Sequence, residues 1–342
     1  MRTMVTGGAG FIGSTLVDRL LVDGHEVDVI DDFSTGSLHN LDEARGLAGR
    51  ALTIHQLDIR LPETEELIRR RRPEVIFHMA AQVNVRVSVA DPVLDADVNV
   101  LGSLRVLEGA RAAGTDRIVF AASGGTLYGE PDPSKLPIVE SEPHSPLSPY
   151  GTAKMAVISY LAAYRKLYAL EFCALALANV YGPRQDPHGE AGVVAIFADA
   201  LVRGEAVKIF GDGEQTRDYV YVDDVADAFV RAATKGGGLV CNIGTGTETS
   251  VNDLYLIMAA AAGVEPASEH LPARAGELLR NSLNSSRARI QLGWRPSTAL
   301  ADGVAAVLDS ARKLQVAGPG AARRGPAERG RDRPRARRGA RG

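Results

Sequence analysis

The glycine-rich stretch TGGAGFIG at residues 6–13 constrains the fold more than any other part of this chain. It follows the short apolar run RTMV and precedes a segment of helical periodicity, whose apolar side carries Phe11, Ile12, Leu16, Leu20 and Leu21. Glycines let the backbone turn tightly and contact a diphosphate, and the N-terminus of the following helix supplies free N–H groups. No Gly-Lys-Ser/Thr follows, so the stretch is not a P-loop. The context predicts a dinucleotide-binding strand, turn and helix.

Strand and helix patterns alternate through the first half of the chain. The apolar runs RTMV, EVDVI, ALTIHQL, EVIFHMA, RIVFAA and LEFCALAL are separated by segments of helical periodicity at 11–23, 63–72, 94–113 and 150–168. Near-continuous apolar strands that alternate with helices are typical of a parallel sheet covered on both faces. We therefore predict an α/β fold with a doubly wound parallel Rossmann sheet.

The pattern changes after Ala178, where the shorter strands VKIFGDG, DYVYV and LVCNIG mix with helices near 191–204, 223–234 and 252–262. We predict a dinucleotide-binding Rossmann domain at 1–178, to whose sheet a segment near 219–242 returns, and a smaller α/β substrate domain at 179–316. Residues 317–342 contain nine arginines against Glu328 and Asp332, a net charge of +7, so the preceding residues carry −10. We predict a disordered tail, and we regard nucleic-acid binding as unlikely because no aromatic residue is interleaved to stack on bases.

Composition is that of a soluble globular protein, with 45% hydrophobic and 24% charged residues among 342. No segment approaches the ~18–20 uninterrupted apolar residues that span a bilayer, and the glycine-rich stretch begins too early for a signal peptide to precede it. These features predict a cytoplasmic protein with no membrane contact. Cys173 and Cys241 lie far apart in apolar runs, which indicates buried thiols and neither a disulfide framework nor a metal site.

Asp31 closes the second predicted strand, 18 residues after Gly13. An acidic side chain at that place accepts hydrogen bonds from the adenosine ribose hydroxyls and repels a 2′-phosphate. The sequence therefore favours NAD over NADP as the cofactor. Asp58, after the third strand, is placed to meet the adenine edge.

Tyr150 and Lys154 lie four residues apart in SPYGTAK, at the start of a predicted helix, so that their side chains share one face. A free tyrosine has a pKa near ~10, and lowering it by ~3 units needs ~4 kcal/mol of preferential stabilisation of the phenolate. One ammonium ~4 Å away at an effective dielectric of ~20 supplies about that much. The pair predicts a tyrosine general base assisted by lysine.

Several motifs in one order resemble those of the extended short-chain dehydrogenase/reductases, specifically their UDP-galactose 4-epimerase-like branch of nucleotide-sugar enzymes. The match runs through roughly residues 1–312 and rests on TGGAGFIG, VIDD, HMAAQ, AASGGTLYG, SPYGTAK, ANVYGP and GDGEQTRDYVYVDDVADA. The resemblance implies that Tyr150 is the catalytic base and that Lys154 binds the nicotinamide ribose. Many relatives carry the hydroxyl that binds the sugar O4 at the position of Gly124, so that role falls here to Ser123, with Thr126 as substitute.

The resemblance also implies two sets of binding residues. The NAD-binding set comprises Gly7, Gly10, Phe11, Ile12, Gly13, Asp31, Asp32, Asp58, Ile59, Ala80, Ala81, Asn99, Tyr150 and Lys154. The substrate-binding set comprises Gln82, Arg86, Asn179, Val194, Phe210, Arg217, Arg274 and Glu277. No metal site is implied.

The strip at 124–126 discriminates among reactions of the family. Related 4,6-dehydratases carry an adjacent Asp–Glu pair there and hexuronate decarboxylases usually a Glu, whereas this chain has Gly124, Gly125 and Thr126. The resemblance then implies a UDP-hexose 4-epimerase of the UDP-glucose/UDP-galactose type, with a 4-keto intermediate. A UDP-glucuronate 4-epimerase is the alternative enzyme, and a catalytically silent NAD-sensing regulator or scaffold is the alternative of another class.

Basic side chains near the sugar end bear on the choice between hexose and hexuronate. Arg86, Arg184 and His188 are candidates to meet a C5 carboxylate, although Arg184 has Asp186 and Glu190 as possible partners. Asn281 occupies the region of a gate residue that is bulky and aromatic in some relatives, so an N-acetyl sugar stays open.

The helices at 94–113 and 150–168 carry more apolar residues than one sheet-facing side requires, among them Val98, Leu101, Leu104, Leu107, Val157, Leu161 and Tyr164. In the resembling family these helices pair across a two-fold axis, which predicts a homodimer.

Overall fold

The computed structural model describes residues 1–188, 192–273 and 278–317. Seven parallel strands form its main sheet in the order β11-β6-β5-β4-β1-β2-β3, which confirms the predicted doubly wound Rossmann architecture. The strands are β1 Arg2–Thr6, β2 Glu26–Asp31, β3 Leu52–Gln56, β4 Val75–His78, β5 Arg117–Ser123, β6 Glu171–Leu177 and β11 Leu239–Ile243. All four residues of β4 are buried, as a strand covered on both faces requires.

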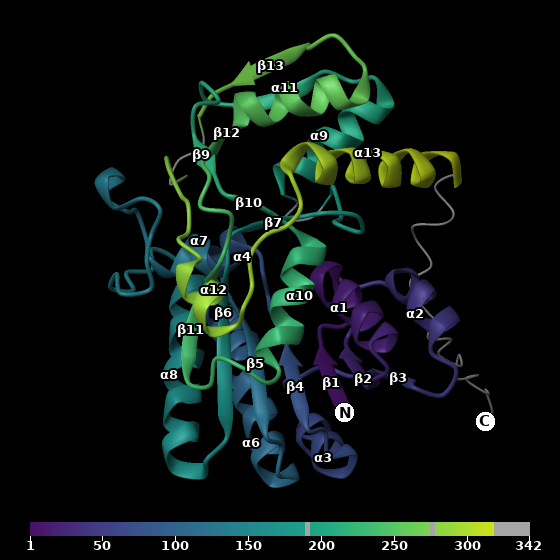
Figure 1. Cartoon of the computed structure of the whole chain (residues 1–342), viewed down its shortest axis with the longest axis vertical. Helices are drawn as coiled ribbons and strands as arrows, with labels where there is room; N and C mark the ends of the chain where they lie inside the picture. The colour runs from purple at the N-terminus through teal and green to yellow at the C-terminus, as the bar shows by residue number, and fades with distance from the viewer. Residues whose placement is uncertain (189–191, 274–277, 318–342) are drawn as a thin grey trace, which may run out of the picture.

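Helices cover both faces of this sheet (Figure 1). Because the strand order reverses direction between β1 and β4, right-handed crossovers place α3, α6 and α8 beside one another on one face and α1 with α10 on the other. The helices are α1 Phe11–Val22, α2 Asp42–Leu47, α3 Pro62–Arg71, α6 Ser103–Ala113, α8 Pro149–Tyr168, α10 Val222–Ala232 and α12 Ser286–Gln291. Single 3-10 turns lie at Leu38–Leu41 (η1) and Pro133–Lys135 (η3).

The helix predicted over 94–113 is divided in the structure. It consists of α5 Pro92–Ala96, a π-helical turn η2 Asp97–Gly102 and α6, and the short α4 Val85–Ala90 precedes it. Hydrophobic periodicity cannot distinguish a π turn from an α-helix, because the wider turn adds only a local irregularity. α7, Gly124–Leu127, is a further single turn after β5.

The second lobe sits above the carboxyl edge of the sheet (Figure 1). It contains α9 Val193–Arg203, α11 Val251–Ala262 and α13 Leu300–Ala317, and three small sheets pair β10 Tyr219–Tyr221 with β7 Asn179–Tyr181, β12 Thr249–Ser250 with β9 Thr216–Arg217, and β13 Ser268–Leu271 with β8 Val207–Phe210. Its own core includes Phe197, Met258 and Leu308. In the segment near 219–242, β11 is a strand of the main sheet and α10 packs against that sheet, whereas β10 pairs with β7.

No helix in the described part of the chain is long and apolar enough to cross a bilayer. Cys173 and Cys241 are both free and buried, on the neighbouring strands β6 and β11. The tail at 318–342 lies outside the described residues.

Asp218 connects the two lobes. Its fully buried carboxylate accepts hydrogen bonds from the backbone N–H groups of Thr245 (2.8 Å), Gly246 (3.0 Å) and Leu283 (3.1 Å), and from the Thr245 hydroxyl. Leu283 in turn packs against Gly124, where an added Cβ would lie 2.3 Å from its Cδ1. Asp218 therefore sets the distance between the second lobe and the end of β5.

We expect Asp218→Asn to lower the free energy of unfolding by about 3 kcal/mol, because one carboxylate oxygen becomes an N–H group that faces backbone N–H donors. Urea unfolding followed by circular dichroism measures the change. Asp212→Asn is the matched control, since within the described residues the exposed Asp212 side chain accepts the Glu214 N–H alone, which an asparagine also does. Equal stability of the two variants would contradict the connecting role of Asp218.

Candidate functional site

The glycine-rich turn between β1 and α1 crosses the end of β4 at backbone contact distance. Gly7 has φ +71°, and a Cβ there would lie 2.7 Å from the backbone nitrogen of Ala80. A Cβ on Gly13 would lie 2.1 Å from the Gly7 carbonyl oxygen. Gly10 begins α1 without a side-chain cap, so the first N–H groups of the helix stay available to an anion. This cradle fits a dinucleotide diphosphate.

Asp31 ends β2 beside the cradle. Its carboxylate accepts hydrogen bonds from the N–H groups of Ala9 (2.9 Å) and Phe33 (2.8 Å), and burial raises its pKa above the usual range. A Cβ on Gly36 would lie 2.8 Å from Asp31 Oδ1, so the chain after β2 passes closely over the carboxylate. Asp32 is turned outward and accepts bonds from Ser34. Asp31 thus has its expected place and also holds the turn together.

Asp58 follows β3 and is already paired. The Arg60 guanidinium contacts both carboxylate oxygens, at 2.6 Å for the shortest pair, and lowers the Asp58 pKa. Arg60 also reaches Asp97 at 3.2 Å. The neighbouring Ile59 is buried against Gly102 of η2. An adenine at this edge would therefore meet an arginine–carboxylate pair.

Gln82 and Asn99 are bound to each other. The Asn99 side chain accepts the Gln82 N–H and donates to the Gln82 carbonyl, both at 2.9 Å, so it holds the strip from Ala80 to Gln82 as a neighbouring strand would. The Gln82 side chain bonds the backbone of Asn84 and the carboxylate of Asp95. Both side-chain amides thus make hydrogen bonds within the protein. The contact of Asn99 with the cofactor and that of Gln82 with the substrate stay predictions.

A buried chain of hydrogen bonds, which the sequence analysis missed, joins this strip to the glycine turn. The Thr6 hydroxyl lies 2.7 Å from His78 Nδ1, and His78 Nε2 lies 2.8 Å from the Ser103 hydroxyl, which donates to the Asn99 carbonyl. Since that hydroxyl donates onward, His78 must carry its proton on Nε2. Burial and the nearby Lys154 lower the pKa of His78 to about 3, so the ring is neutral.

Tyr150 and Lys154 lie in the first turns of α8, which Ser148 caps by accepting the Gly151 N–H at 3.2 Å. The Lys154 ammonium is buried, donates to the Ala121 carbonyl at 3.0 Å, and lies 5.6 Å from the centroid of the Tyr150 ring. Burial lowers the pKa of Lys154 to about 8, against an opposing effect of Asp95. Burial and the Asp95 charge raise the pKa of Tyr150. The structure therefore places Tyr150 and Lys154 together, as their spacing predicted, with Asp95 as an unpredicted neighbour.

Ser123 and Thr126 flank this pair at the end of β5 and in α7. Thr126 packs against the turn that carries Tyr150, because a Cβ on Gly151 would lie 2.7 Å from its carbonyl oxygen. Its hydroxyl points back to the Ser123 carbonyl at 3.5 Å, whereas the Ser123 hydroxyl makes no hydrogen bond with any described residue. That difference favours Ser123 for a hydroxyl contact with a ligand.

The predicted substrate residues of the second lobe have different environments. Asn179 begins β7, Phe210 ends β8 and Arg217 lies in β9. The Val194 side chain is buried in the core of the second lobe, so a ligand contact there would involve its backbone only. Arg274 and Glu277 lie outside the described residues. Asn281 is buried with both amide atoms unpartnered among the described residues, two positions before Leu283.

The three basic residues considered for a sugar carboxylate do not converge. Among the described residues, Arg184 pairs with Asp18 on α1 at 2.6 Å and with Glu43 on α2 at 3.0 Å, and not with Asp186; Glu190 lies outside the described residues. Arg86 is exposed on α4, and His188 is exposed in the loop after β7. Sequence proximity suggested local partners for Arg184, but the folded chain brings it to the other lobe.

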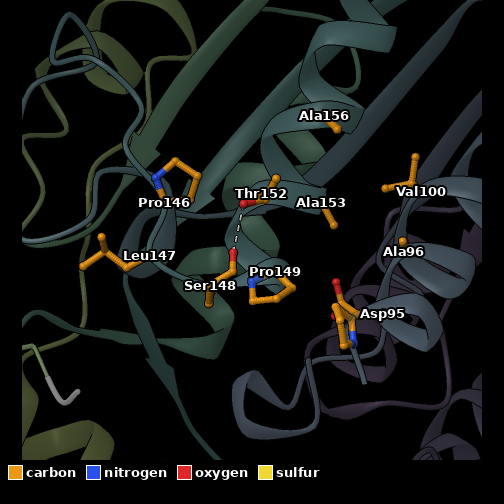
Figure 2. Close-up of a pocket in the computed structure, with 11 residues that line it drawn as sticks. Asp95, Ala96, Val100, Pro146, Leu147, Ser148, Pro149, Thr152, Ala153 and Ala156 are labelled. Carbon is orange, nitrogen blue, oxygen red and sulfur yellow. Dashed lines mark hydrogen bonds between the residues drawn. The ribbon is translucent and has the colours of Figure 1, made fainter. Parts of the chain in front are cut away.

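A cavity of about 550 Å³ lies between α5, η2 and the start of α8 (Figure 2). Asp95, Ala96 and Val100 line one side, and Ser148, Pro149 and Thr152 line the other. The cavity therefore lies along the start of α8 and not at the glycine turn.

A family model, a related sequence and two related structures that match this chain are all named as epimerases. A model of the NAD-dependent epimerase/dehydratase family matches residues 3–244. A UDP-glucose 4-epimerase of Mycolicibacterium smegmatis is 52% identical over 310 residues, which are 90% of this chain and 98% of that protein. Two crystal structures of UDP-glucose 4-epimerases superpose closely: that from Thermotoga maritima with UDP-glucose (TM-score 0.87, 43% identity, 92% and 99% covered) and that from Thermus thermophilus with NAD (0.84, 41%, 91% and 99%).

We expect Asp31→Ala to weaken NAD binding about tenfold and to relax discrimination against NADP, because a charged acceptor and its repulsion of a 2′-phosphate are both lost. Titration of protein stripped of nucleotide measures both affinities. Asp23→Ala, at the exposed end of α1, removes a carboxylate from the same unit and should bind as the wild type does. An unchanged preference for NAD would assign the ribose contact to another residue.

Proposed function

Because the chain belongs to the NAD-dependent epimerase/dehydratase family, we propose that it is an NAD-dependent UDP-glucose 4-epimerase, which interconverts UDP-glucose and UDP-galactose. The proposal is supported by relatives named UDP-glucose 4-epimerase that match over almost their whole length. The family name covers two reactions, however, so the choice of epimerase depends on the site itself.

The residues at 124–126, beside Tyr150, favour the epimerase reaction over the dehydratase reaction. Elimination of water next to the C4 ketone needs a proton donor and a base near C5 and C6. Gly124, Gly125 and Thr126 offer no carboxylate there, and Leu283 fills the space above Gly124. Only proton transfer at O4 is left for this site to assist.

Tyr150 performs that transfer in the proposed mechanism. Its phenolate accepts the proton of the sugar O4 and later returns it to the same oxygen of the 4-keto sugar. Lys154 lowers the phenol pKa by its charge, and Ser123 orients O4 by a hydrogen bond. The glycine cradle and Asp31 would hold NAD, which when bound would supply reversible hydride acceptance at C4. The sugar must turn over between the two transfers to expose its other face.

The position of Arg184 supports a neutral sugar over a hexuronate. Burying an unpaired C5 carboxylate is costly, so a dedicated hexuronate site should contain a free cation. Arg184 is neutralised by Asp18 and Glu43, and Arg86 is exposed on α4. Retention of Tyr150 and Lys154 in a shared buried site supports an enzyme over a silent NAD sensor.

Incubation with UDP-glucose or UDP-glucuronate, followed by NMR of the anomeric signals, tests the proposal. We expect UDP-galactose to form, with a kcat/KM at least tenfold above that for UDP-glucuronate. Tyr150→Phe should retain NAD and its melting temperature yet lose activity by several orders of magnitude, since only the proton acceptor is removed. Tyr160→Phe, on the exposed side of the same helix, is the control. Preferential turnover of UDP-glucuronate, or an active Tyr150→Phe variant, would overturn the assignment.

We also propose that the protein is a cytoplasmic homodimer, which uses the outer side of α4, α5, η2 and α8. Of the residues singled out for their periodicity, Leu107, Val157 and Leu161 face the core, but Leu101 is 55% exposed. Further exposed apolar side chains lie on the same elements and near them, at Val89, Val93, Leu147 and Tyr160. A contiguous apolar area of this kind is typical of an interface. The buried, unpaired cysteines agree with a reducing compartment.

Leu101→Glu should convert the dimer to a monomer at micromolar concentration, because it buries an unpaired charge at the two-fold axis. Sedimentation velocity measures the change in mass. Leu256→Glu introduces the same charge at a comparably exposed leucine of α11, in the second lobe, and should leave the dimer intact. A monomeric wild type would refute the interface outright.

A further inference from the structure

Asp95 is a buried carboxylate behind the catalytic helix. It lies in α5, is 1% exposed, and its Oδ1 accepts hydrogen bonds from Gln82 Nε2 (3.0 Å) and Asn99 Nδ2 (2.9 Å). Its Oδ2 is buried without a hydrogen-bond partner among the described residues. Figure 2 shows Asp95 across the cavity from Ser148, Pro149 and Ala153 at the start of α8. Buried charges are normally paired, so this oxygen needs an electrostatic partner.

Lys154 is the buried charge on the other side. Its ammonium is 3% exposed, donates one hydrogen bond to Ala121, and lies over the rings of Phe120 (4.8 Å) and Tyr150 (5.6 Å). A carbonyl and two aromatic faces do not neutralise a buried ammonium. Lys154 therefore needs a counter-charge from an element that packs against α8.

The other charged groups on those elements are paired or face elsewhere. Arg86 on α4 is exposed, Asp97 on η2 pairs with Arg60, and Glu108 on α6 pairs with Arg111 and Tyr164, three helical turns from Lys154. Arg117 and Glu171 begin β5 and β6, at the opposite end of the sheet. His78, behind Phe120, is a neutral ring. Within the described part of the chain, Asp95 alone is left to compensate Lys154.

We propose that Asp95 is the counter-ion of the buried Lys154 ammonium and a positioning residue for the reaction, holding Gln82 and Asn99 in the wall of the site. The kinetic consequence rests on the proposed epimerase function, but the electrostatic coupling of the two buried charges does not. Asp95 raises the pKa of Lys154 against the desolvation that lowers it. The carboxylate thereby keeps the lysine charged at neutral pH, and only a charged lysine stabilises the Tyr150 phenolate.

Asp95→Asn removes the charge with little change of shape, and its pH profile tests the kinetic consequence. The alkaline limb of kcat/KM, where Lys154 loses its proton, should move down by about one pH unit, and activity at pH 8 should fall about fivefold. Asp91→Asn removes the same charge from the exposed N-cap of α5, where asparagine caps equally well, and should keep the wild-type profile. A lowered profile with unmoved limbs would show that Asp95 acts by packing alone, which would overturn the counter-ion assignment.

Stability against pH tests the ion pair without any enzymatic readout. The pKa of Lys154 is lowered to about 8 in the folded protein, so between there and the unfolded value the folded state binds fewer protons and stability rises with pH. In Asp95→Asn, Lys154 should lose its proton about one pH unit lower, so the stability of the variant should begin to rise near pH 7. The difference in Tm between wild type and variant should therefore be largest at pH 6.5 and smaller at pH 9. A constant difference would contradict the pairing.

A double-mutant cycle keeps the proposal testable if Asp95→Asn folds poorly. Lys154→Met removes the ammonium, so Asp95→Asn combined with Lys154→Met should regain Tm relative to Asp95→Asn alone. Additive losses of Tm would overturn the pairing even if the protein proved to be an active epimerase. A coupled pair in a protein that converts no UDP-sugar would instead refute the proposed function and leave the counter-ion in place.

Discussion

The backbone contact between the glycine turn and the end of β4 is the constraint on which the site depends. With a Cβ at Gly7 only 2.7 Å from the Ala80 nitrogen, no other residue fits without separating β1 from β4. At the same contact, the N–H groups of Met79 and Ala80 donate hydrogen bonds to the Thr6 hydroxyl. From Thr6 the hydrogen bonds continue through His78 and Ser103 to Asn99. The glycine turn and the wall beside Tyr150 and Lys154 are therefore parts of one hydrogen-bonded arrangement, at the point where the strand order reverses.

Few charged side chains of the described residues lie inside this arrangement, and two of them, Lys154 and Asp95, have opposite charges. His78 is neutral because its two nitrogens are taken up by hydroxyls in a dry environment. Lys154 and Asp95 are the buried ions near Tyr150, and each lowers the cost of burying the other. Burial and the Asp95 charge raise the pKa of the Tyr150 phenol.

The second lobe is attached through polar contacts rather than through a continuous core. Its apolar cluster is separate from that of the main sheet. Asp218 ties its own segment to those of Thr245–Gly246 and Leu283, and Arg184 joins α1 and α2 to the loop after β7. Hydrogen bonds and ion pairs have stricter geometric requirements than apolar packing, so these two contacts fix the position of the second lobe more closely than a hydrophobic interface would.

The sequence by itself determined the Rossmann sheet, the glycine cradle, the cofactor class and the Tyr150–Lys154 pair, because each depends on local spacing: glycines between a strand and a helix, an acid at a strand end, two side chains one helical turn apart. Tertiary structure alone decided what those groups meet. It divided the helix at 94–113 with a π turn, paired Arg184 with Asp18 on α1, buried Val194 in a core, and brought Asp95 and His78 near Lys154. In the sequence Asp95 is an ordinary acid in the predicted helix at 94–113, and no spacing rule connects it to a lysine 59 positions later. Such pairings arise from the packing of whole elements, and the charge balance of the site is therefore a property of the fold.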